Sequence, residues 1–137
     1  PFEQPRLPLD AAAHLEHRPK VPVVNSAVHI YPISVACNRV ASDATAFAFR
    51  DATFATVIAG MWPDPADNEA NIKWVRDYYD ATAAHSEAGG YVNFMMTDEA
   101  PDRLPTTYGD NFERLGAIKA VYDPDNFFRV NQNIAPT

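Results

Sequence analysis

The last third of the chain contains a run of apolar residues with a helical period. Their spacings of three and four place on one helix face Phe112, Leu115, Ile118 and Tyr122. Asp110 and Glu113 stand three residues apart, the pattern of a capping box at the start of a helix. The ring of Pro124 disfavours helical geometry at the residue before it. The pattern therefore predicts a helix from about residue 110 to 122 that packs by one apolar face.

A second helical pattern lies in the middle of the chain. Asp67 or Asn68 can cap its N-terminus, and the pattern continues to about Ala84. Its apolar stripe is expected to comprise Ile72, Val75 and Tyr79, flanked by Trp74 and Tyr78.

Residues with β-propensity and looser alternation predict four strands. These are residues 28–33, residues 45–49 after a turn at 42–44, residues 54–61, and a short strand at 91–96. A polar, proline-containing loop is expected over 97–107. The order of strands and helices predicts an α+β fold, with a mainly antiparallel sheet and helices on one face.

The first 27 residues contain five prolines, which disfavour a regular helix or a central strand. Residues 10–16 could hold a turn or two of helix, and the rest is interpreted as an extended segment on the surface.

Composition narrows the class of protein. The 137 residues include 18 acidic and 11 basic side chains, a net charge of −7, which argues against nucleic acid or an anionic membrane as the main partner. No run of 18 apolar residues and no leader pattern is visible, so we expect no membrane span and favour a soluble, cytoplasmic protein. Cys37 is the only cysteine, and we interpret it as a buried structural thiol.

Candidate chemistry is concentrated in the predicted strand 91–96. On a strand, Tyr91 and Asn93 share one face. An amide buried without a partner costs about 1–3 kcal/mol, so Asn93 either pairs with a loop carbonyl or serves a site.

Other polar residues give weaker indications. His29 and Tyr31 share a face of the first strand and are candidates to line a substrate cavity, although such a pair more often forms a half-buried sheet face. His14 and His17 lie three residues apart without a third ligand at fitting spacing, so no metal site is expected. The chain has no glycine-rich loop that could hold a phosphate.

An ordered series of short motifs runs from residue 91 onward: Tyr91-Val92-Asn93-Phe94, Tyr108-Gly109-x-Asn111, Arg114-Leu115, Lys119, Tyr122-Asp123-Pro124-x-Asn126-x-Phe128 and Gln132-x-Ile134. This series closely resembles the C-terminal segment of berberine-bridge-enzyme-like FAD-linked oxidases. Residues 28–50, with the runs HIYP and TAFAFRDA, look like the end of that family's substrate domain. The resemblance implies that residues 1–90 are the C-terminal part of a substrate-binding domain. Residues 91–137 would then be the berberine-bridge-like segment, with the FAD-binding domain outside this chain.

The resemblance also implies roles for individual residues. Tyr91 and Asn93 match the family's Tyr-x-Asn-Tyr pattern, but Phe94 replaces its second tyrosine, which is implicated in removing the substrate's proton. Phenylalanine has no group that can act as a base. We therefore expect Tyr91, Asn93 and Phe94 to face flavin or substrate without a clear base, and Tyr91, Asn93 and Gln132 to contact the cofactor. A base from outside the chain and the oxidation of a neutral amine both stay open. Asn126, Gln132 and Asn133 are expected to hold the tail in place.

The sequence thus predicts the C-terminal portion of an FAD-dependent oxidoreductase that oxidises a small organic molecule by hydride transfer to flavin. Its FAD-binding domain would belong to the same chain or to a separate one. Residues 1–137 alone are expected to be inactive, to bind FAD weakly and to self-associate. The alternative is a stand-alone, non-catalytic α+β binding module derived from that family.

Overall fold

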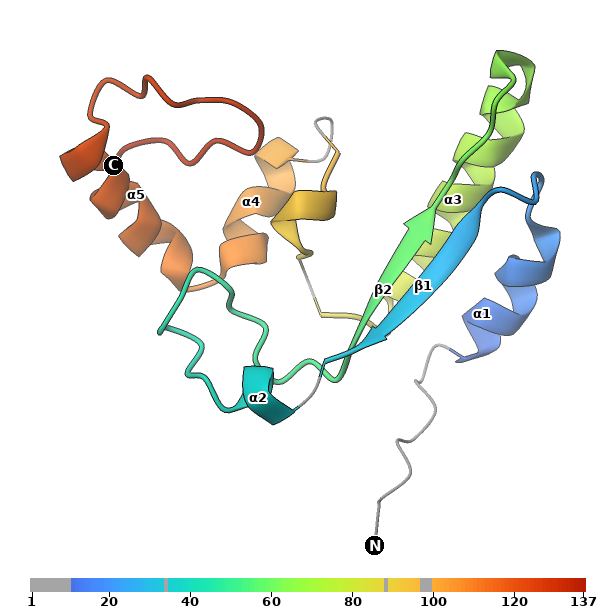
Figure 1. Cartoon of the computed structure of the whole chain (residues 1–137), viewed down its shortest axis with the longest axis horizontal. Helices are drawn as coiled ribbons and strands as arrows, with labels where there is room; N and C mark the ends of the chain where they lie inside the picture. The colour runs from blue at the N-terminus through green and yellow to red at the C-terminus, as the bar shows by residue number, and fades with distance from the viewer. Residues whose placement is uncertain (1–10, 34, 88, 97–99) are drawn as a thin grey trace, which may run out of the picture. The chain divides into compact units, whose positions relative to one another are not determined.

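The computed structural model describes residues 11–33, 35–87, 89–96 and 100–137. Within these ranges the elements are, in order, α1 (Ala11–His17), η1 (Arg18–Lys20), β1 (Ala27–Pro32), α2 (Val35–Asn38), β2 (Phe54–Ala59), η2 (Pro65–Asp67), α3 (Asn68–Ala83), η3 (Val92–Phe94), α4 (Ala100–Tyr108) and α5 (Asn111–Tyr122), where η marks a 3-10 helix (Figure 1). The chain divides into two compact units. One comprises Pro1–Tyr31 and Phe54–Glu87, and the other comprises Pro32–Thr53 and Ala88–Thr137.

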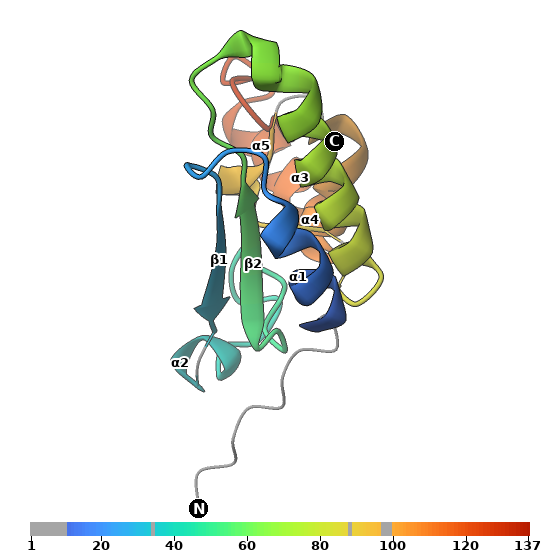
Figure 2. The same ribbon diagram turned by 90° about the vertical axis from the view of Figure 1, so that its right-hand side faces the viewer.

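The first unit contains the sheet. Within the described ranges it has two strands, β1 and β2, which run antiparallel (Figure 1). Helices α1 and α3 lie side by side on one face of this sheet (Figure 2). Ser26, before β1, joins the strands because its hydroxyl accepts a hydrogen bond from the Met61 amide at 3.0 Å. The predicted α+β class is confirmed, and the predicted helix in residues 10–16 is α1.

Helix α3 follows the predicted span, but the prediction of its buried face was wrong. The side chains that it buries are Asn71, Trp74, Tyr78 and Thr82, whereas Ile72 and Tyr79 are 40% and 43% exposed. Trp74 donates its indole N–H to the His17 carbonyl at 2.9 Å, and the Tyr78 hydroxyl lies 2.7 Å from His14 Nδ1. The flanking aromatics are therefore buried, because their rings pack on α1 while their polar ends find partners.

Two of the four predicted strands are absent from the described residues. Residues 42–46 form the predicted turn and continue as bends, and 47–50 have no regular structure. Thr45 accepts hydrogen bonds from the Phe47 amide and from Arg50, and these side-chain contacts replace a strand ladder. The segment 91–96 contains the 3-10 helix η3, in which the Phe94 amide donates to the Tyr91 carbonyl at 2.9 Å.

The prediction of a loop over residues 97–107 was also wrong for the described residues 100–107. Residues 97–99 lie outside the described ranges, and α4 occupies 100–108. Pro105 stands inside α4, and its carbonyl accepts the Gly109 amide at 2.9 Å. Gly109 has φ +53°, a backbone angle that favours glycine and turns the chain into α5.

Helix α5 has the predicted span, but two details differ from the prediction. Asp110 makes no side-chain cap, so the expected capping box is absent. The face that was expected to pack is half-buried at Phe112 and Leu115 but exposed at Ile118 and Tyr122, by 44% and 84%. Cys37, expected to be buried, is half-buried, and its Sγ lies 3.2 Å from Arg50 Nη1. None of the described helices is long and apolar enough to cross a membrane.

Candidate functional site

The segment before η3 is fixed by close approach to its neighbours. Gly89 has φ +107°, and a Cβ at this position would lie 2.6 Å from the Phe49 ring and 2.7 Å from the Thr106 carbonyl oxygen. Arg103 of α4 donates to the Gly89 carbonyl at 2.8 Å. Only glycine fits this passage, which sets the start of η3 against α4.

The tail after α5 begins in a hydrogen-bonded turn around Asp123. The Asp123 carboxylate accepts the Phe127 amide at 2.7 Å, the Phe128 amide at 3.1 Å and the Lys119 ammonium group at 2.8 Å. Lys119 also donates to the Phe128 carbonyl at 2.5 Å. The hydrogen bond from Lys119, with further help from the two amides, lowers the pKa of Asp123 below its ordinary value of 3.8.

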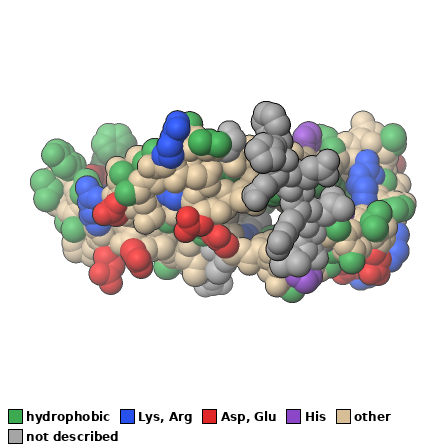
Figure 3. Space-filling view, turned by 90° about the horizontal axis from the view of Figure 1, so that it is seen from below, with side chains coloured by type: hydrophobic (Ala, Val, Ile, Leu, Met, Phe, Trp, Pro, Cys, Tyr) green, Lys and Arg blue, Asp and Glu red, His purple; other side chains and the backbone are tan. Residues whose placement is uncertain are grey.

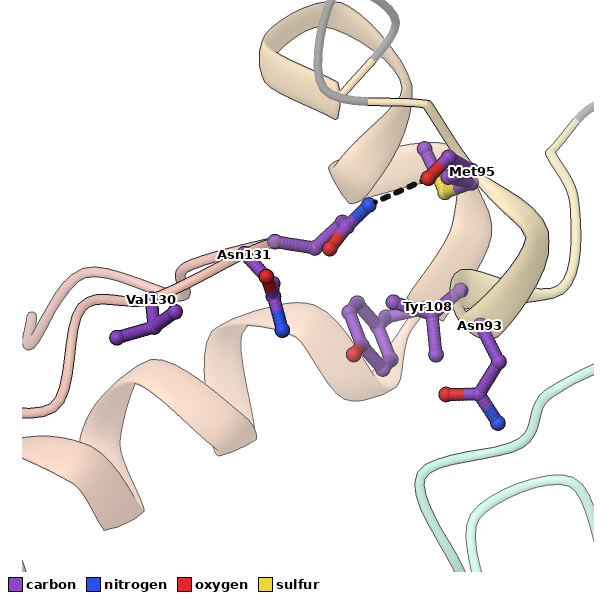
Figure 4. Close-up of a pocket in the computed structure, with 7 residues that line it drawn as sticks. Asn93, Met95, Tyr108, Val130 and Asn131 are labelled. Carbon is purple, nitrogen blue, oxygen red and sulfur yellow. Dashed lines mark hydrogen bonds between the residues drawn. The ribbon is translucent and has the colours of Figure 1, made fainter.

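From this turn the tail runs back to η3 and then to α5. The Gln132 side chain donates to the Met95 carbonyl at 2.7 Å (Figure 4). Farther along, the Thr137 amide donates to the Gly116 carbonyl at 3.3 Å. The tail is therefore held at three points.

This arrangement encloses an open cavity of about 490 Å³, which we call the amide cavity. It is lined by Val92, Asn93, Met95, Tyr108, Val130, Asn131 and Gln132. The ring of Tyr108 lies between Asn93 and Asn131 (Figure 4). None of these lining residues carries a charge, so the cavity offers amides and one phenol to a ligand.

A second cavity of about 180 Å³ adjoins the same residues. It is lined by Ala46, Phe47, Gly90, Tyr91, Val92, Asn93, Thr107 and Tyr108. Val92, Asn93 and Tyr108 therefore line both cavities.

The structure brings together some of the residues that the sequence predicted for the site. Asn93 is exposed, and its side-chain amide donates to the Tyr91 hydroxyl at 2.7 Å. The amide is therefore neither buried nor unpaired. Gln132 lines the amide cavity, and Tyr91 lines the second cavity. Phe94 lines neither; it is 59% exposed and packs edge-on against the Tyr91 ring at 5.5 Å.

The remaining predicted residues lie elsewhere. His29 and Tyr31 belong to the other unit, where their rings stack at 5.9 Å on β1 and both side chains are exposed. Asn126 and Asn133 lie in the tail outside both linings. Each has a buried side-chain oxygen without a hydrogen-bond partner in the described part of the chain.

Sequence reasoning missed Tyr108 and Asn131 as site residues. In the sequence, Tyr108 belongs only to the Tyr-Gly motif after an expected loop, and Asn131 stands beside Gln132 without a predicted role. Gly109 is the feature of the sequence that could have indicated Tyr108. A glycine is typical of the position just after a helix, so Gly109 places Tyr108 at the end of a helix, next to the turn into the following one. Burial raises the pKa of Tyr108 above its ordinary value of 10.0.

Comparison with known proteins identifies the segment that carries the amide cavity. Residues 90–135 match the family model described as "Berberine and berberine like". These residues belong to the berberine-like family. The resemblance seen in the sequence is confirmed.

Longer relatives extend this similarity to most of the chain. The FAD-linked oxidoreductase YgaK of Bacillus subtilis is 37% identical over 122 residues, which cover 89% of this chain and 26% of that protein. The crystal structure of aclacinomycin oxidoreductase matches with a TM-score of 0.74 and 26% identity, over 93% of this chain and 30% of that one. A glycopeptide hexose oxidase complexed with teicoplanin matches with a TM-score of 0.73 and 27% identity, over 93% and 29%. The chain spans about a quarter of the length of the curated relatives that it matches, and those relatives are oxidoreductases.

Proposed function

We propose that this chain is part of an FAD-dependent oxidoreductase that oxidises a small organic substrate by hydride transfer to flavin. The observation that carries the proposal is the amide cavity, which lies wholly within the berberine-like segment. In this proposal residues 1–90 complete a substrate-binding domain, and residues 91–137 form one wall of the active site. An FAD-binding domain in the same or a separate chain supplies the opposite wall.

The lining fits only one part of FAD. Primary amides and a phenol can hydrogen-bond the uncharged polar edge of a flavin ring. Among the described residues of the lining there is no cation and no glycine-rich turn for the diphosphate. Asn93 and Gln132 would therefore contact the ring, with Tyr91 beside them. FAD, when bound, supplies the acceptor for hydride, and the protein orients the substrate.

No described residue that lines the two cavities is suited to act as a base at neutral pH. Asn93, Asn131 and Gln132 are neutral amides, and burial keeps the Tyr108 phenol protonated because it raises the pKa. A base from the rest of the enzyme, or a substrate that reacts as a neutral amine, agrees with this lining.

The tail has a surface suited to the rest of such an enzyme. Between 73% and 84% of the side chain is exposed at Val121, Tyr122, Phe127, Phe128 and Val130, which we call the tail patch. Hydrophobic side chains gather at the left end of Figure 3, where α5 and the tail lie. Exposed apolar side chains gathered in this way are typical of an interface. Because the match to this chain covers only 26% of the length of such a relative, the proposed occupant is the FAD-binding domain.

The test is made on full-length protein from its native source. We expect a visible flavin spectrum and a polypeptide much larger than these 137 residues, or a second chain that copurifies. Anaerobic mixing with small alcohols, sugars and amines should bleach the flavin band with at least one of them. A colourless protein that contains only these residues would contradict the proposal and favour the stand-alone binding module.

A further inference from the structure

Tyr108 lies at the wall shared by the two cavities. It is the last residue of α4, and the turn at Gly109 brings its ring against Phe112 of α5, where the two rings stack with centroids 6.4 Å apart. The ring therefore packs against α5, while one side of it borders the amide cavity (Figure 4). A side chain placed in this way loses little conformational freedom when a ligand binds.

The hydroxyl of Tyr108 is available to a ligand. Within the described part of the chain it makes no hydrogen bond, although the side chain is half-buried. The ring lies between Asn93 and Asn131, and its hydroxyl is directed toward the side on which Asn131 lies (Figure 4). A half-buried phenol usually finds a hydrogen-bond partner, and here the open side is the cavity.

The surroundings of Tyr108 determine which ligand atom it suits. The described lining residues of both cavities are uncharged, so no cation stabilises a phenolate and no carboxylate takes up the proton. Because burial raises its pKa, the hydroxyl is protonated at neutral pH and can donate. An ionised ligand group would lose hydration in this cavity without gaining an opposite charge.

We propose that Tyr108 is a substrate-binding residue that donates a hydrogen bond to an uncharged oxygen of the ligand. The ligand group is a hydroxyl or carbonyl oxygen on the side of the cavity where the Asn131 amide lies. This inference rests on the proposed function, since it assigns the chemical class of the group bound at the same site.

The test uses the full-length, flavin-containing enzyme and its Tyr108→Phe variant. Binding of glucose, glucosamine and glucuronate is measured by titration calorimetry, since these probes share one ring and differ in charge. The wild type is expected to bind glucose more tightly than either charged sugar. Loss of one hydrogen bond between neutral groups should weaken glucose binding about 3- to 10-fold in the variant. Flavin content and melting temperature should not change.

Two further variants make the result specific. Tyr79→Phe removes a phenol of α3 that is 43% exposed and lies outside both cavities, and it should leave glucose binding unchanged. Phe94→Tyr, added to Tyr108→Phe, restores a phenol at a position that lines neither cavity and should not rescue binding.

The outcomes separate this inference from the function on which it rests. A protein without flavin would overturn the proposed function, and this inference with it. A flavoprotein that binds no glucose, prefers a charged sugar, or binds equally well without the Tyr108 hydroxyl would overturn only this inference. Rescue by Phe94→Tyr would also overturn it, since the phenol would then act from position 94.

Discussion

Gly116 illustrates how one residue can set the position of a distant segment. It is buried in the middle of α5, and its carbonyl receives the Thr137 amide at 3.3 Å. A Cβ at this position would clash with Thr137 Oγ1 and would lie 3.3 Å from the Ala135 carbonyl oxygen. The tail can therefore lie against the helix only because position 116 has no side chain.

We predict that Gly116→Ala lowers the melting temperature of the full-length protein, although alanine favours a helix by about 1 kcal/mol over glycine. Overpacking costs about 1–3 kcal/mol and outweighs that gain. The double variant Gly116→Ala/Thr137→Ala removes the nearest clashing atom and should recover most of the loss. A Gly116→Ala protein as stable as the wild type would show that the tail does not rest on α5.

Three of the residues predicted for the site line one or both of the cavities: Tyr91, Asn93 and Gln132. Phe94 lines neither, and the strand predicted for its segment is a 3-10 helix. A strand sends residues 91 and 94 to opposite faces, whereas a 3-10 helix has three residues per turn and aligns them, as the Tyr91–Phe94 contact shows.

At the scale of elements, the turn after α5 joins a helix end to the site. The carboxylate of Asp123 bonds two amides of the tail and Lys119 of the helix. The side chains of Lys119 and Asp123 are 16% and 12% exposed. The ion pair is therefore sheltered, and it determines the direction in which the chain leaves α5.

We predict that this turn loosens in acid. The pKa of Asp123 is lowered in the folded protein, chiefly by the hydrogen bond from Lys119. The stability that it contributes is thus present above the ordinary value of 3.8 and is lost as the pH falls below it. Hydrogen exchange of peptides that contain Phe127 and Phe128 should show protection factors that decline over this range. The decline should be absent in Asp123→Asn, which should be less protected at neutral pH, and unchanged in the neighbouring variant Asp125→Asn.

Element boundaries were easier to predict than the faces that elements bury. The spans of α3 and α5 follow from their polar starts and from the break at Pro124. The buried face of α3 did not follow, because a stripe of Ile72, Val75 and Tyr79 is as good a helical pattern as the observed one. What decides between them is the hydrogen bond that Trp74 donates to His17, a contact between segments far apart in the sequence.

For the chain as a whole, the fold class and the family predicted from the sequence were correct, but the predicted sheet had too many strands. The segments 45–49 and 91–96 have strand-like composition, yet no neighbouring strand is found for either in the described ranges. Without a partner strand, backbone groups bond locally, as in η3. Composition shows which residues suit a strand and does not show what lies beside them.

We predict that the tail patch stabilises the full-length enzyme. The double variant Phe127→Ser/Phe128→Ser should lower the melting temperature and the flavin content, since each buried Phe contributes about 1.5–3 kcal/mol. Leu15→Ser, at an apolar residue of α1 that is 79% exposed, is the matched control and should change both far less.

Residues 1–137 alone should bind FAD weakly and self-associate in sedimentation, and the double serine variant should reduce that association. Equal stability of the double variant and the wild type would exclude the patch as an interface.

The tail leaves α5 at its end and returns to its middle, which has a consequence for changes in chain length. Lengthening a loop whose two ends stay in place adds little to its closure free energy, which grows only with the logarithm of length. Residues inserted between Phe128 and Val130 would therefore leave the fold nearly as stable as before. They would nevertheless shift Gln132 away from the Met95 carbonyl, because the number of residues between Asp123 and Gln132 sets where the Gln132 side chain lies. The position of the tail depends on which of its residues meet Met95 and Gly116, and not on a rigid backbone. An insertion would therefore disturb the site more than most substitutions would.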